Sequence, residues 1–184
     1  MLTSGINFLN FNEKKNNPAV KRKLNLILKK KNQVIESLTE NYKYNFNIKK
    51  INKFKKSKNY RIIGMGGSTL GTQAIYDFLN HKIKKKFNFV DNLQVIQKNK
   101  SNKNNFYTNL VVSKSGNTIE TILNANIFIK KKDKNIFITE NKKSYLFLLA
   151  QKLKAEIIHH NNFIGGRYSV LSEVGMLPAE LMGL

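Results

Sequence analysis

The stretch YRIIGMGGSTLGTQAIYDFL, residues 60–79, decides the fold because it joins a short apolar run, a glycine-rich loop and an amphipathic segment. The same alternation continues to residue 160, where short runs rich in Val and Ile are separated by segments of helix length. This pattern is typical of β-α-β units with a buried parallel sheet. We therefore predict an α/β fold, with a parallel sheet of about five strands flanked by helices.

The predicted strands are YRIIGM, NLQVI, NLVVS, NIFIT and EIIHH, which begin at residues 60, 92, 109, 135 and 156. The predicted helices are TLGTQAIYDFL, TIETILNANIFI and SYLFLLAQKL, which begin at residues 69, 118 and 144.

The first part of the chain has a different pattern. Apolar residues recur at spacings of three and four from Val20 to Leu38, which predicts an amphipathic helix. A passage rich in Lys and Asn follows between Glu40 and Asn59 and shows no sustained period. We predict an N-terminal helical arm over residues 1–45 and an α/β domain over residues 46–184.

The composition limits the classes of function. The 184 residues include 33 Lys and Arg against 11 Asp and Glu, a net charge of +22. The lysine runs are dispersed between apolar segments, so we expect no specific nucleic-acid partner, although a nucleic-acid binder stays an alternative. The chain has no cysteine, which excludes disulfides and thiolate metal sites. We see no membrane-spanning or signal segment and expect a cytoplasmic protein.

Two loops follow predicted strands, at the sheet edge where α/β proteins bind ligands. The loop GMGGSTLG, residues 64–71, lacks both the dinucleotide fingerprint and the P-loop lysine. Its glycines allow close backbone approach, and the Ser68 hydroxyl lies where a helix begins. The loop SKSGNTIET, residues 113–121, offers hydroxyls on Ser113, Ser115 and Thr118. We predict phosphate there; the alternative is that these hydroxyls only cap the next helix.

Three segments together resemble a known family. SKSGNTIET resembles the phosphate-binding segment of sugar isomerase (SIS) domains, and GMGGSTLG resembles the glycine loop that precedes it in phosphoglucose isomerases. NFIGGRYSVLSEVG, residues 162–175, resembles the signature segment of the phosphoglucose isomerase family. The resemblance implies a Rossmann-like three-layer SIS fold, and it implies interconversion of glucose 6-phosphate and fructose 6-phosphate without cofactor or metal.

The resemblance also implies roles for individual residues. Arg167 would face the reacting carbons as a fixed cation, although a surface salt bridge is the alternative. Glu120 and Gly166 would lie near the site, and Glu120 could instead complement a helix dipole. The residues expected to bind the substrate and its phosphate are Gly67, Ser68, Ser113, Lys114, Ser115 and Thr118.

Part of the family's machinery has no counterpart here. The family's proton-transferring glutamate, its ring-opening histidine and a further lysine lie downstream of the matched region. We therefore expect an N-terminal piece of a longer enzyme, inactive by itself and homodimeric when complete. His159 and His160 are adjacent on a predicted strand and should point to opposite faces, which favours structural roles. The alternative is a stand-alone SIS module that binds or senses sugar phosphates.

Overall fold

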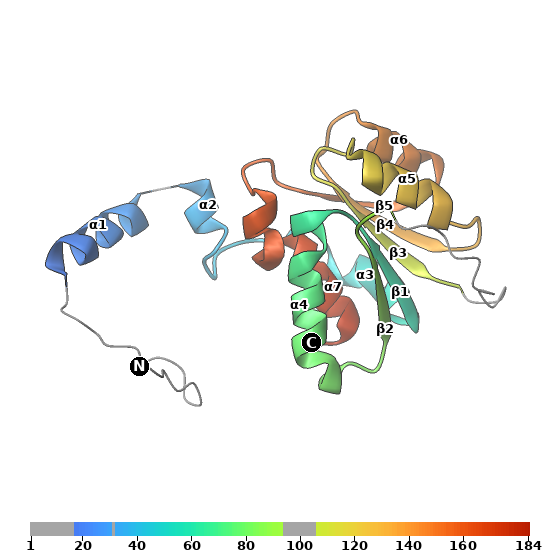
Figure 1. Cartoon of the computed structure of the whole chain (residues 1–184), viewed down its shortest axis with the longest axis horizontal. Helices are drawn as coiled ribbons and strands as arrows, with labels where there is room; N and C mark the ends of the chain where they lie inside the picture. The colour runs from blue at the N-terminus through green and yellow to red at the C-terminus, as the bar shows by residue number, and fades with distance from the viewer. Residues whose placement is uncertain (1–16, 31, 94–105) are drawn as a thin grey trace.

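A five-stranded parallel sheet forms the centre of the computed structural model, which describes residues 17–30, 32–93 and 106–184 (Figure 1). The strands lie in the order β2-β1-β3-β4-β5, and every neighbouring pair is parallel. Their bounds are β1 (Asn59–Ile63), β2 (Lys86–Val90), β3 (Thr108–Val112), β4 (Lys134–Thr139) and β5 (Glu156–His159). The predicted parallel α/β fold is confirmed.

Helices cover both faces of this sheet (Figure 1). One face packs against α3 (Ile48–Lys55), α4 (Leu70–Leu79) and α7 (Glu173–Met182), and the other against α5 (Ile119–Phe128) and α6 (Tyr145–Lys152). Successive strand residues serve opposite faces, which explains the continuous apolar runs. The first core includes Ile62, Leu110 and Ile136, and the second includes Ile63, Val111 and Phe137.

Two elements were not predicted from the sequence, because lysines interrupt the apolar pattern in or beside them. The passage between Glu40 and Asn59 contains α3, whose Ile51 and Phe54 are buried and whose N-terminus is capped by Asn47. Strand β2 is KFNFV, directly after a lysine run, and its Phe87 belongs to the core. The predicted strand NLQVI lies mostly in residues 94–105, outside the described residues.

The N-terminal region holds two helices where one was expected. They are α1 (Pro18–Lys29) and α2 (Gln33–Glu36), and neither has a buried residue. Figure 1 shows α1 away from the sheet. Residues 1–16 lie outside the described residues, so the arm over 1–45 and its boundary with the domain stay a prediction.

Downstream of α2, a buried carboxylate holds the chain to the domain. Glu173, at the start of α7, is fully buried and accepts hydrogen bonds from the Tyr42 hydroxyl and the Asn45 amide, each at 2.9 Å. Burial and the hydrogen bond to Glu173 raise the pKa of Tyr42, so its phenol stays a donor. This contact joins segments more than a hundred residues apart in the sequence.

We predict that the buried phenol of Tyr60 makes the fold sensitive to alkaline pH. The Tyr60 side chain donates to the Phe54 carbonyl oxygen at 2.8 Å, and burial raises the pKa of Tyr60 to about 12. The unfolded chain loses this proton near pH 10, so above that pH stability falls by about 1.4 kcal/mol per pH unit until the folded pKa is reached.

Urea unfolding of wild type and Tyr60→Phe at pH 10 and pH 11.5 checks this prediction. Titration of the lysines and of Tyr42 affects both chains equally. Between the two pH values the wild type alone should therefore lose a further increment of about 1–2 kcal/mol in its free energy of unfolding. Parallel pH profiles for the two chains would contradict it.

Candidate functional site

The two predicted ligand loops lie side by side. The strand order reverses between β1 and β3, and in such sheets the crevice at the carboxyl ends of those strands is the usual ligand site. One loop follows β1 and enters α4 through a short turn, η1 (Gly66–Ser68), and the other leads from β3 into α5. A Cβ added to Gly64 would lie 3.0 Å from the Val112 carbonyl oxygen, so the backbones of the two loops are in contact.

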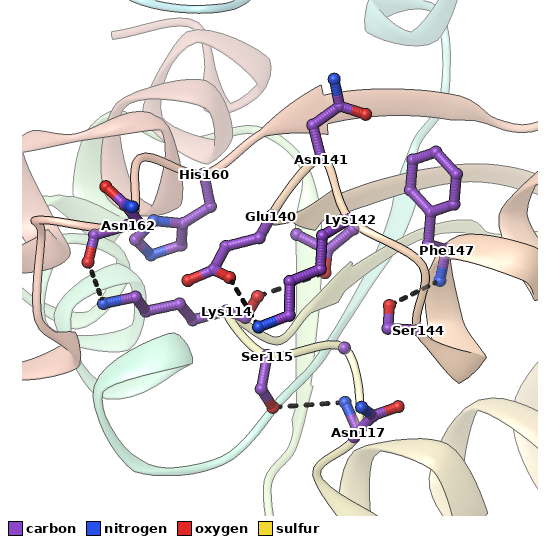
Figure 2. Close-up of polar contacts among 12 residues, drawn as sticks. Lys114, Ser115, Asn117, Glu140, Asn141, Lys142, Ser144, Phe147, His160 and Asn162 are labelled. Atoms are coloured by element: carbon purple, nitrogen blue, oxygen red, sulfur yellow. Dashed lines mark hydrogen bonds and ion pairs between the residues drawn. The ribbon is translucent and has the colours of Figure 1, made fainter.

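The serine loop is held in a defined turn. The buried Ser113 hydroxyl lies 3.0 Å from the Thr118 hydroxyl and accepts from the Gly116 amide at 3.2 Å. Gly116 has a φ of +68°, and a Cβ there would lie 2.1 Å from the Ser144 hydroxyl, so this turn requires glycine. The Ser115 hydroxyl accepts from the Asn117 amide at 3.2 Å and is exposed to solvent (Figure 2).

The helices at this site differ from the other described helices at their N-termini. Side chains cap the helices α1, α2, α3, α6 and α7, through Asn17, Asn32, Asn47, Ser144 and Ser172. The N-cap residues of α4 and α5, Thr69 and Thr118, make no such bond. Thr69 donates to the Gly66 carbonyl oxygen instead, and Thr118 pairs with Ser113. Thr118 is thus the N-cap residue of α5 by position, but its hydroxyl does not cap the helix, contrary to the alternative interpretation.

This difference matters for anion binding. The first amides of a helix point outward and carry a partial positive charge, which favours an anion when no side chain satisfies them. Here two such N-termini, those of α4 and α5, follow adjacent strands. The arrangement suits a multiply charged anion with several acceptor oxygens.

The third motif docks on the glycine loop by direct backbone contact. Its GRYSVL portion forms the 3-10 segment η3 (Gly166–Leu171). A Cβ on Gly67 would lie 2.3 Å from the Gly166 carbonyl oxygen, and the buried Ser169 hydroxyl bonds the carbonyl oxygens of both glycines, at 3.1 and 2.7 Å. The structure thus brings Gly67, Ser68, Gly166 and Arg167 to one place.

Two cations reach this edge from different motifs. Arg167 is exposed beside Gly67, and among the described residues no carboxylate forms an ion pair with it. The salt-bridge alternative is therefore not what the structure has. Lys114 donates through Nζ to the Asn162 backbone oxygen, which links the serine loop to the residues that precede Gly165 (Figure 2).

Sequence reasoning did not assign Glu140 and His160 to this edge. Figure 2 shows both beside Lys114, at the ends of β4 and β5. The Glu140 amide donates to the Lys114 carbonyl oxygen at 3.0 Å, and its carboxylate lies 3.6 Å from the Lys142 ammonium. His160 is buried, and burial lowers its pKa, which favours the neutral imidazole. The available signal was their position at the carboxyl ends of predicted strands: Glu140 directly follows NIFIT, and His160 is the last residue of EIIHH.

Glu120 occupies the first turn of α5 and is half-buried. Both interpretations of Glu120, site-lining or dipole-complementing, remain compatible with that position. In the part of the chain that the structure describes, no three His, Asp or Glu side chains gather as metal ligands would. Nor does any described helix have the length and apolar character to span a membrane.

We predict that the contact between the two glycines tolerates a methyl group from one side only. Gly67→Ala would drive a Cβ into the Gly166 carbonyl and should lower the free energy of unfolding by about 3 kcal/mol. A Cβ on Gly166 would meet its nearest atom at 3.8 Å, so Gly166→Ala should cost about 0.5 kcal/mol or less. Urea unfolding of both variants measures the difference, and equal losses would disprove the docking geometry.

Known proteins resemble most of the chain. The family model described as phosphoglucose isomerase matches residues 17–183. The glucose-6-phosphate isomerase of Methanocaldococcus jannaschii is 33% identical over 154 residues, with 77% of this chain and 37% of the relative covered. The glucose-6-phosphate isomerase of Mycoplasma genitalium is 34% identical over 160 residues, and the match covers 76% of this chain and 37% of the relative. The chain therefore spans about 37% of the length of these curated relatives.

Solved structures share the fold. A hypothetical protein from Thermus thermophilus has a TM-score of 0.66 at 21% identity, covering 90% of this chain and 43% of its own. The tagatose-6-phosphate ketose/aldose isomerase of Escherichia coli has a TM-score of 0.54 at 18% identity, and the match covers 71% of this chain and 40% of the isomerase. A protein of Escherichia coli CFT073, solved in complex with a ligand, has a TM-score of 0.58 at 14% identity. The match covers 92% of this chain and 93% of that protein's chain. The predicted three-layer sugar isomerase fold is confirmed.

Proposed function

The chain belongs to the phosphoglucose isomerase family, and from that premise we propose that it supplies the sugar-phosphate-binding part of a glucose-6-phosphate isomerase. The observation that carries the proposal is the pair of adjacent helix N-termini, α4 and α5, that no side chain caps. Hydroxyls of Ser68, Ser115 and Thr118 lie in the loops that lead into these helices.

A phosphate dianion is the group that this arrangement would bind. Each charge-assisted hydrogen bond to a phosphate oxygen contributes about 1.5–3 kcal/mol, so a few bonds from amides and hydroxyls anchor a small metabolite. Lys114 would add a positive charge by turning from the Asn162 carbonyl toward the phosphate. The buried Ser113 acts indirectly, because its hydroxyl positions Thr118 and the Gly116 amide.

Arg167 would act at the reacting carbons, C1 and C2, at the end of the sugar away from the phosphate. The proposed isomerisation moves a proton from C2 to C1 and shifts the carbonyl from C1 to C2 through an enediolate, with no net oxidation and hence no redox cofactor. The intermediate carries negative charge, and a guanidinium that stays protonated stabilises it at a fixed position. The proton-transferring base would come from the portion of the enzyme that this chain does not match. The complete enzyme would be a cytoplasmic homodimer.

A second candidate is a stand-alone module that binds a sugar phosphate without catalysis. The Escherichia coli CFT073 protein favours it, because the match covers almost the whole of that chain and that chain holds a ligand in its structure. The two candidates share the phosphate site and differ in whether a second domain participates.

We predict that the isolated chain binds glucose 6-phosphate through the serine loop. Isothermal titration should show binding of glucose 6-phosphate and not of glucose, and Ser115→Ala with Thr118→Ala should weaken it at least tenfold. Thr39→Ala is the matched control, since the Thr39 hydroxyl donates to the Glu36 carbonyl oxygen at 2.8 Å, outside the serine loop, and this variant should leave affinity unchanged. Full affinity in the double variant would refute the phosphate site.

We also predict that the 184-residue chain alone shows no isomerase turnover, although it binds the substrate. The chain is purified from a host that lacks its own glucose-6-phosphate isomerase, and fructose 6-phosphate formation is followed by NMR. Turnover that disappears in Arg167→Ala would show that the chain holds a base of its own and that this part of the proposal is wrong.

A further inference from the structure

Lysine runs that are dispersed in the sequence meet at one edge of the sheet. Because all the strands are parallel, the residues that precede or begin them lie together at the amino edge, opposite the candidate site. Lys86 begins β2 and Lys134 begins β4, and these strands flank the β1–β3 pair. Exposed lysines at the amino edge include Lys56, Lys58, Lys84, Lys86, Lys132 and Lys134.

Three of these lysines surround a pocket at the amino edge. Its volume is about 440 Å³, and Lys58, Lys132 and Lys134 line it together with Phe106 and Tyr107. Its charged lining residues in the described chain are all lysines. Lys58 and Lys132 form no ion pair with a described residue, and Lys134 donates to a backbone carbonyl oxygen of α3 at 3.2 Å. The pocket therefore concentrates positive charge and suits an anion.

Two acidic side chains also lie at the amino edge, and both are engaged elsewhere. The Asp133 carboxylate accepts from the backbone amides of Tyr107 and Lys130, at 3.2 and 3.1 Å, and from an asparagine side chain of β3 at 3.0 Å. Glu156 forms an ion pair with Lys53 at 2.8 Å. Neither carboxylate pairs with a lysine of the pocket, so the pocket ammonium groups stay available to a ligand.

The aromatic residues of the pocket narrow the class of anion. Phe106 is 61% exposed. Tyr107 is held in place by Arg61, whose guanidinium carbon lies 4.0 Å from the centre of the tyrosine ring and whose Nη1 donates to the Phe128 carbonyl oxygen at 3.0 Å. Exposed aromatic rings among lysines are the combination on which unpaired bases stack while the phosphates meet ammonium groups. A nucleotide fits this chemistry better than a simple inorganic anion.

We propose that the amino edge of the sheet binds single-stranded nucleic acid, with one base against Phe106 in the pocket and successive phosphates on the lysines. The lysines continue along the edge to Lys84 and Lys86 of the β2 side, beyond the pocket, which suits a chain of phosphates rather than one. Lysine contacts to phosphates carry no sequence information, so binding should show no base-sequence preference. This surface goes beyond the proposed function and uses the opposite edge of the sheet.

Fluorescence anisotropy with a labelled oligothymidylate of about twelve nucleotides tests the proposal on the full 184-residue chain. The triple variant Lys58→Gln, Lys132→Gln and Lys134→Gln should weaken binding at least tenfold at about 100 mM salt. The slope of log K against log salt should become less steep by about 2, because each lost phosphate contact contributes about 0.7 for a single strand.

Two further variants separate a local site from attraction to the net charge. The matched control removes three exposed lysines from α1, which lies away from the sheet (Figure 1), and should bind within twofold of wild type. Its substitutions are Lys21→Gln, Lys23→Gln and Lys29→Gln. Phe106→Ala should weaken binding about fivefold or more without changing the salt slope, because stacking releases no counterion.

Four outcomes would overturn the proposal. They are the absence of binding by wild type, equal weakening by the two triple variants, equal affinity for a duplex of the same length, and displacement by an equimolar amount of thymidine monophosphate. The third would exclude stacking of an unpaired base, and the fourth would assign the pocket to a free nucleotide. Binding to phosphatidylglycerol vesicles in place of the oligonucleotide would likewise assign the edge to a membrane surface.

Glucose 6-phosphate distinguishes this surface from the phosphate site. Its binding should be the same in wild type and in the pocket triple variant, since the two sites lie at opposite edges of the sheet. An excess of glucose 6-phosphate should leave the oligonucleotide bound. Displacement would place the strand at the N-termini of α4 and α5 and would contradict the proposal, whereas failure of the phosphate site alone would leave oligonucleotide binding unchanged.

Discussion

Parallel hydrogen bonding between β1 and β3 holds the two loops of the candidate site together. These strands are separated in sequence by β2, yet they pair directly, with Ile62 opposite Leu110 and Ile63 opposite Val111. The chain must therefore leave toward β2 on one side and return to β3 on the other. Both carboxyl ends then open into the same crevice, and the helices that follow, α4 and α5, aim their N-termini at it.

The third motif depends on this arrangement. Its backbone can rest on Gly67 only because that position carries no Cβ, and the Ser169 hydroxyl fixes the contact by bonding both glycine carbonyls. Immediately afterwards Glu173 anchors α7 to Tyr42 and Asn45. Arg167 is thus held between a backbone contact on one side and a buried carboxylate on the other, while its side chain stays exposed.

The two ends of the candidate site offer different chemical groups. The α4 and α5 N-termini and the serine loop offer amides and hydroxyls, which suit phosphate binding, and Arg167 offers a fixed positive charge, which suits an enediolate. An apolar groove along α4 begins at this second end. Its lining includes Leu70, Phe78 and Val170 as well as Arg167, so the groove and the candidate site share this arginine.

The sequence by itself determined the parallel α/β class and the three loop motifs, because strand and helix periodicity and glycine-hydroxyl spacing are local properties. The family was indicated by the resemblance of those three motifs to known segments. The sequence pattern did not predict α3 and β2, because lysines interrupt the apolar period there, although Ile51, Phe54 and Phe87 are buried. Only the tertiary structure decided that Thr118 pairs with Ser113, that Gly67 touches Gly166 and that α4 exposes an apolar groove. These facts depend on strand order and packing between distant segments, which no local pattern encodes.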